Sequence, residues 1–171
     1  VDGANGNDGN DGQTMPTALK TLQKAANILN AGQMVLVKGG NYLGSSLKTT
    51  VGLTRSGLPN AQLIFKNYNG EKVSFDGSVG DSVVNQGDEM FDFGGGVSNI
   101  IIDGFELYNF SQTIYLRGDN ENITLMNINI PLNRNYGVIG RGNNIRIENF
   151  FINNSADRGI AAGGTNFHIY S

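Results

Sequence analysis

An asparagine returns at a nearly constant interval through the second half of the chain. Asn99, Asn122, Asn144 and Asn166 are separated by 23, 22 and 22 residues, and apolar residues stand at the same offsets from each of them. A repeat of this length predicts a solenoid, in which one supersecondary unit stacks on the next. The functional side chains of a solenoid must lie in columns along the stack.

The residues after each asparagine predict two short strands. Apolar residues stand one and three positions after it, which is the alternation of a strand with one buried face. The apolar offsets then change to six and eight, so the chain must bend in between, where Gly104, Asn127 and Asn149 tolerate positive φ. The amides of Asn127 and Asn149 are also able to form a hydrogen-bonded ladder, and the sequence leaves both roles open. The first two apolar columns are Ile100, Ile123, Ile145 and Phe167, and Ile102, Leu125, Ile147 and Ile169.

A third strand precedes each asparagine. Its apolar positions are six and eight residues earlier, where Arg158 interrupts one column. Three inward-facing strands in each turn of about 22 residues predict an all-β chain, a right-handed single-stranded parallel β-helix. We treat residues 1–171 as one domain, in which the turns of the β-helix occupy 33–171. The early strands are predicted at 33–38, 61–65 and 73–75. The two columns of the third strand are Phe93, Leu116, Val138 and Ile160, and Phe91, Ile114, Tyr136 and Arg158.

The first 13 residues are almost all glycine, asparagine and aspartate. We interpret residues 1–13 as a coiled lead-in. The alternative is a calcium-binding loop, because Asp2, Asp8 and Asp11 offer oxygen ligands.

The apolar stripe within residues 17–29 predicts one α-helix, with Thr14 or Thr17 as its N-cap. We expect this helix to cover the apolar end of the first turn. At the other end the sequence stops at Ser171, inside a bend, and no second cap follows. We therefore expect either a piece of a longer β-helix or a subunit whose open end is covered by another copy.

The composition argues against several functions. The net charge is −3, so a surface for nucleic acid or for a basic contact with a membrane is not indicated. No apolar run approaches the roughly 20 residues of a transmembrane helix. The start at Val1 without a signal-peptide pattern, together with the absence of cysteine, favours a processed, secreted, extracellular protein.

Three segments resemble a known family. The start at 1–12, VLVKGGNY at 35–42 and IFKNYNGEKVSFDG at 64–77 are similar to the N-terminal half of secreted right-handed β-helix polysaccharide lyases, especially the family-nine pectate lyases. The resemblance implies an acidic polysaccharide as partner, cleaved by β-elimination with calcium held in a carboxylate cluster. That cluster is followed by a lysine and lies in later turns of the family. Its nearest match here, SADRG at 155–159, lacks the second aspartate and the lysine, so whether this chain is an enzyme stays open.

The resemblance also implies where a ligand would lie, along the outer side of the third strand. We expect Arg117, Arg134 and Arg158 to bind carboxylates, with Tyr115 stacking on a sugar ring and Asp157 beside them. Glycines at 137 and 159 predict a shallow floor, and Asp119 and Arg141 fall in one column and predict an ion pair across turns. The second hypothesis is a structural or adhesive solenoid that self-associates through its open last turn.

Overall fold

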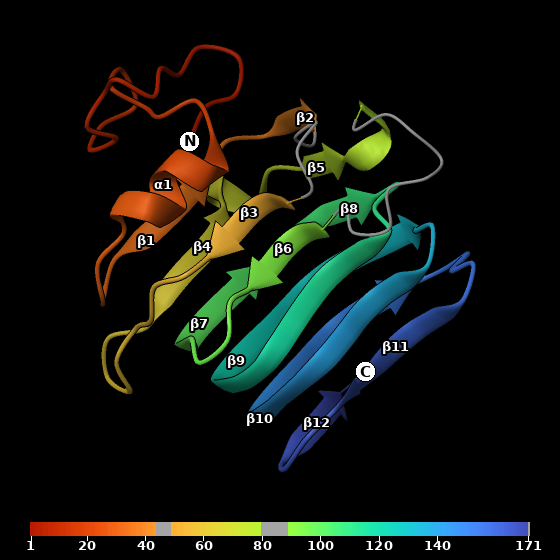
Figure 1. Cartoon of the computed structure of the whole chain (residues 1–171). Coiled ribbons are helices and arrows are strands. Elements are labelled where there is room, and N and C mark those ends of the chain that lie inside the picture. Colours follow the sequence, from red (N-terminus) through yellow and green to blue (C-terminus); the bar gives the residue numbers. More distant parts are fainter. Residues whose placement is uncertain (44–48, 80–88, 171) are drawn as a thin grey trace.

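The chain folds as the predicted right-handed parallel β-helix, with a short helix at its amino-terminal end (Figure 1). The structure is a computed structural model and describes residues 1–43, 49–79 and 89–170. Every pairing between its named strands is parallel. Within the described residues, none of the helical segments has the length and apolar character needed to span a membrane.

Strands of successive turns stack into three sheets, which we call faces A, B and C. Strands β9 (Gln112–Leu132) and β10 (Tyr136–Ile152) bend through all three faces. Short 3-10 turns, η1 (Tyr68–Gly70) and η2 (Gly77–Val79), follow two of the early strands. Face A contains β3 (Thr49–Leu53), β6 (Glu89–Phe93) and β11 (Arg158–Gly163). Face B contains β1 (Met34–Val37), β4 (Leu63–Asn67), β7 (Ser98–Asp103) and β12 (Phe167–Tyr170). Face C contains β2 (Gly40–Leu43), β5 (Val73–Asp76) and β8 (Glu106–Tyr108).

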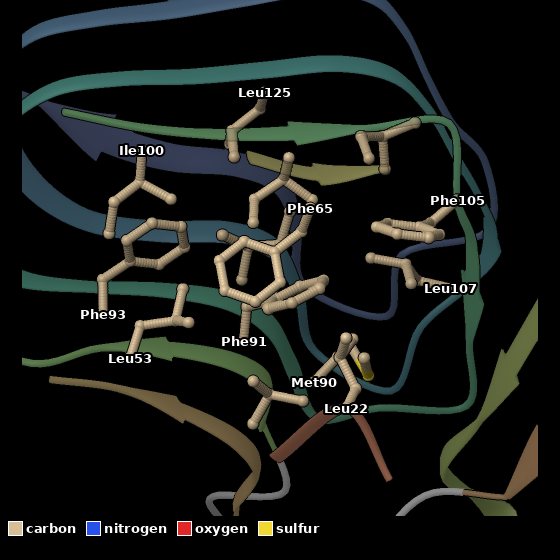
Figure 2. Close-up of a cluster of buried hydrophobic side chains, with 14 of the residues drawn as sticks. Leu22, Leu53, Phe65, Met90, Phe91, Phe93, Ile100, Phe105, Leu107 and Leu125 are labelled. Carbon is tan, nitrogen blue, oxygen red and sulfur yellow. The ribbon is translucent and has the colours of Figure 1, made fainter. Parts of the chain in front are cut away.

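The interior is a stack of like side chains, as the repeat predicts. Ile123 pairs in register with Ile100 below and Ile145 above, and Phe167 follows on Ile145. Figure 2 shows side chains from the three faces and from the helix meeting in this core. Phe105 packs against Phe75, with their ring centroids 5.8 Å apart. Burial of each such side chain contributes about 1.5–3 kcal/mol, so the stacked columns dominate the stability of the fold.

The helix α1 (Leu22–Ile28) is shorter than the predicted span of 17–29. Its N-cap is Thr21, whose hydroxyl accepts from the Lys24 amide at 3.2 Å, so the prediction of Thr14 or Thr17 was wrong. The reason lies in the lead-in, which uses the carbonyls of residues 17–19 to accept its own amides. Gly12, Asn7 and Asp2 donate to the carbonyls of Thr17, Ala18 and Leu19 respectively, which keeps that stretch outside the helix.

The lead-in and α1 together protect the edges of the first turn. The Val1 nitrogen donates to the Leu36 carbonyl at 2.6 Å, and the Lys38 amide donates to the Val1 carbonyl at 2.9 Å. On face A, the side chain of Gln23 bonds both the N–H and the C=O of Gly52 in β3. Open strand edges invite pairing with other chains, and these contacts occupy part of that edge.

Carboxylates of the lead-in serve this architecture. Asp2 is buried and accepts from the amides of Ala4 and Asn5 at 3.0 Å and from Lys38 at 3.0 Å. Asp8 accepts from the amide and hydroxyl of Thr21, ahead of the helix. The part of the chain that the structure describes contains no group of three acidic, histidine or cysteine side chains placed to hold a metal ion.

The corner asparagines fulfil both roles that the sequence left open. Asn127 and Asn149 have φ values of 53° and 44°, in the left-handed region. The Asn149 amide donates to the Asn127 oxygen at 2.7 Å, and the Asn127 amide donates to Asp103 at 2.6 Å. A second ladder runs through the repeated asparagines, with the Asn144 amide donating to Asn122. In both ladders, each amide donates to the preceding turn.

Face A departs from the predicted register. Val138 stacks on Ile114, and Gly140 on Leu116, whereas the repeat predicted Val138 on Leu116. Arg141 pairs with Arg117 but the next residue pairs with Asn120, so the corner of β9 holds two additional residues, 118 and 119. Counting back from the repeated asparagine assumes that every corner has the same number of residues. It therefore assigns the strand residues before this longer corner to the wrong partners in β10.

Three predictions that depend on that register are wrong. Arg158 stacks on Tyr136, which stacks on Gln112, so Arg158 belongs to a polar column and interrupts no apolar one. Arg141 lies over Arg117 instead of Asp119, and so the predicted ion pair between Asp119 and Arg141 does not form. Ile139 and Ala161 follow Tyr115 in its column, so glycines 137 and 159 do not form the predicted shallow floor there.

Candidate functional site

The outer surface of face A gathers the predicted site residues into three columns along the stack. The strands place alternate side chains outside, while residues such as Phe91, Ile114 and Val138 point into the core. Successive residues of one column are about 4.8 Å apart, the spacing of neighbouring strands. The columns are Glu89, Gln112, Tyr136 and Arg158; Asp92, Tyr115, Ile139 and Ala161; and Arg117, Arg141 and Gly163.

Arg117 is bound by the turn below it. Its Nε and Nη2 donate to Oδ1 and Oδ2 of Asp92 at 2.6 and 2.7 Å, and Glu89 lies 3.6 Å from Nη2. The hydrogen bond to Asp92 is the main cause that raises the pKa of Arg117. The guanidinium also lies over the ring of Tyr115, 4.5 Å from its centroid. A bidentate pair of this kind is among the stronger polar contacts, so the charge of Arg117 is largely compensated.

A second group forms where the chain enters face A from the preceding corner. The Tyr136 hydroxyl hydrogen-bonds the Asp157 carboxylate, which raises the pKa of the phenol. Arg158 lies 3.8 Å from Asp157, and 69% of its side chain is exposed. Exposed pairs at this distance contribute about 0–1 kcal/mol, so Arg158 is free to exchange Asp157 for another anion.

Arg134 lies in the corner between faces C and A, two residues before Tyr136. Its amide donates to the Phe110 carbonyl at 2.8 Å, and its side chain is half-buried. The structure thus unites Tyr115 with Arg117, and Asp157 with Arg158, and adds two residues that the sequence analysis did not select. These are Tyr136, in the column of Arg158, and Arg141, in the column of Arg117.

Arg141 was missed because the predicted register assigned it to Asp119. It is exposed and forms no ion pair within the described part of the chain. The signal in the sequence was the corner itself: Gly118 and Asp119 both adopt positive φ, at 100° and 55°, and glycine and aspartate are residue types suited to such an insertion.

Two hollows lie elsewhere, at the capped end. One of about 480 Å³ separates the lead-in from α1 and β1, and one of about 730 Å³ lies between α1 and β2. The first is bordered by Asp11, which accepts from the Gln13 amide, and the second by Asp2, which binds the main chain and Lys38. Their carboxylates therefore have structural partners already, whereas face A brings exposed arginines and tyrosine rings together on neighbouring turns.

Two solved structures are similar to this chain. One is a pectate lyase, Pel9A, with a TM-score of 0.64 and 25% identity, covering 88% of this chain and 38% of that protein. The other is a rhamnogalacturonan lyase, with a TM-score of 0.59 and 19% identity, covering 90% of this chain and 41% of that protein. The chain has the fold of the parallel β-helix polysaccharide lyases. It spans less than half the length of either lyase, and no family model and no curated protein matches it.

In this lyase fold, strand β6 of face A carries two carboxylates, and the described residues contain no group of three that could hold a metal ion. Glu89 and Asp92 lie on the same strand, but Arg117 takes the position of a cation between them. Calcium prefers six to eight oxygen ligands, which this pair does not supply. Calcium binding therefore remains a prediction from the resemblance.

Proposed function

We propose that the chain is part of a secreted, polysaccharide lyase-like protein and binds acidic, uronate-containing polysaccharide along the outer surface of face A. One observation carries the proposal: aromatic rings and exposed arginines stand on consecutive turns of one face. Aromatic faces pack on sugar rings, and guanidinium groups bind carboxylates with two parallel hydrogen bonds. Tyr115 and Tyr136 supply the rings, and Arg141 and Arg158 supply the exposed charges.

Cleavage demands more than binding. A β-elimination needs a base that is unprotonated at the working pH, which for a lysine or arginine means a lowered pKa, and a cation beside the carboxylate of the substrate. The pKa of Arg117 is raised by its carboxylate partners, which is opposite to what a base requires. We therefore assign binding to this chain and propose that any calcium-dependent cleavage uses residues outside the described part.

The test combines a binding assay with a product assay. Calorimetry with oligogalacturonate should give a measurable heat of binding, weakened by added salt, and a neutral oligosaccharide of equal length should bind less tightly. Ultraviolet absorbance of unsaturated products, with and without added calcium, measures cleavage separately. Equal affinity for the acidic and the neutral oligomer would contradict the proposal.

A structural or adhesive solenoid that associates through its last turn is the second candidate. Its support is the exposed apolar surface of β12, where Ile169 is 56% exposed although it continues a core column. Strands β11 and β12 each pair only with β10 among the described strands. Light scattering at rising protein concentration tests it: association that Ile169→Lys abolishes would favour this candidate.

A further inference from the structure

We propose that Arg141 is the residue that recognises the sugar carboxylate and sets a preference for acidic over neutral polysaccharide. The inference rests on the proposed function and goes further, because it selects one arginine among those that face A displays. Three features of Arg141 carry it: a charge with no carboxylate partner among the described residues, its open surroundings and its fixed backbone.

The first feature is charge. Arg117 and Arg141 are partners in neighbouring strands, at a spacing where two guanidinium groups repel each other unless a carboxylate intervenes. Asp92 and Glu89 draw Arg117 toward β6, the turn on its other side. The guanidinium of Arg117 thus donates to carboxylates of the protein, whereas the donors of Arg141 remain available to a ligand.

The second feature is space. The next residue in the column is Gly163, and a Cβ atom built on Gly163 would meet no atom within 4 Å. The following turn therefore leaves the guanidinium of Arg141 uncovered. The adjacent column offers Ile139 and, one turn below, the ring of Tyr115, so a sugar ring packed there would bring its carboxylate toward Arg141.

The third feature is the backbone on either side. Gly140 has a φ of 121°, and a Cβ atom there would lie 1.8 Å from the Leu116 carbonyl oxygen. On the other side, a Cβ on Gly142 would lie 2.9 Å from the Asn120 carbonyl oxygen. These close approaches hold the segment against the turn below, and a fixed backbone reduces the ordering that binding requires.

The experiment compares two ligands on matched variants. Calorimetry measures the affinity of the chain for a galacturonate oligomer and for its methyl ester, which lacks the negative charge. We expect Arg141→Gln to weaken binding of the acid roughly tenfold or more and to leave binding of the ester unchanged. Arg141→Lys should restore part of the preference, since lysine keeps the charge without the planar fork.

Arg146→Gln is the matched control, because Arg146 is an exposed arginine of the same strand on face B. It should change neither affinity. If the wild-type chain prefers the acid and Arg141→Gln keeps that preference, Arg141 is not the recognition residue while the proposed function stands. If the wild-type chain binds neither oligomer, the proposed function fails and this inference fails with it.

Discussion

Asp92 on β6 grips Arg117 on β9 through two hydrogen bonds of 2.6 and 2.7 Å, across one turn of the solenoid. This contact turns an arginine that the sequence marks as a ligand-binding group into an internal partner. It also separates face A into an end with two carboxylates, on β6, and an end with exposed arginines, on β10 and β11.

Releasing Arg117 should therefore strengthen the binding of an anionic polymer. Asp92→Asn removes one negative charge and leaves the guanidinium free to turn outward, so we expect severalfold tighter binding of oligogalacturonate at low salt. Glu148→Gln is the control, because it frees Arg146 on face B in the same way. Equal gains from both variants would mean that general charge, and not face A, determines binding; affinity electrophoresis in a gel containing polygalacturonate measures both.

Acid should weaken the cap through Asp2. Hydrogen bonding from the Asn5 amide, and then from Lys38, lowers the pKa of Asp2 far below its ordinary value. A carboxyl group with a depressed pKa in the folded state stabilises the fold above its unfolded pKa of about 4 and loses that contribution as the pH falls toward the folded value.

Asp2→Asn should consequently unfold at a temperature that varies less between pH 5 and pH 2 than that of the wild-type chain. Asp119→Asn, at an exposed corner, removes a carboxylate without touching the cap and should follow the wild type. Thermal unfolding followed by circular dichroism at each pH provides the comparison. Parallel curves for wild type and Asp2→Asn would show that Asp2 does not couple the cap to pH.

The tight corner of β10 should not tolerate a side chain at Gly140. An alanine there combines a positive φ with a clash against the Leu116 carbonyl, so we expect a loss of roughly 2–4 kcal/mol. Gly163→Ala lies one turn later in open space and should cost less than about 1 kcal/mol. Urea unfolding gives both values, and similar losses would indicate that the corner relaxes.

Substitutions at Asn127 separate the two roles of the corner asparagine. Asn127→Gly keeps the left-handed backbone and deletes the bonds to Asp103 and Asn149, which should cost about 1 kcal/mol. Asn127→Ala loses the backbone preference as well and should cost about 1–2 kcal/mol more. Equal stability of the two variants in urea would assign the whole effect to the ladder.

The sequence predicted faces B and C well because an asparagine at a corner keeps a fixed distance to the strands that follow it. The columns through Ile123 and Leu125 therefore appear at constant offsets. Face A precedes the asparagine across a corner of variable length, and residues 118 and 119 shifted its register there. The helix start was misplaced for a different reason: long-range bonds from the lead-in to Thr17 and Leu19 overrode local helix propensity.

The same shift explains the partial success at the site. Tyr115 and Arg117 were found because their position relative to Ile114 and Leu116 is local, and alternation alone turns them outward. Arg141 and Tyr136 depend on which residue lies beneath them, and only the three-dimensional register gives that information.

The one-way polarity of the asparagine ladders has a consequence for how coils join. Each coil offers side-chain oxygen acceptors on one side and amide donors on the other, so coils stacked head to tail satisfy these groups. A copy stacked in the reverse orientation would set oxygen against oxygen or amide against amide, and the ladders therefore disfavour that arrangement.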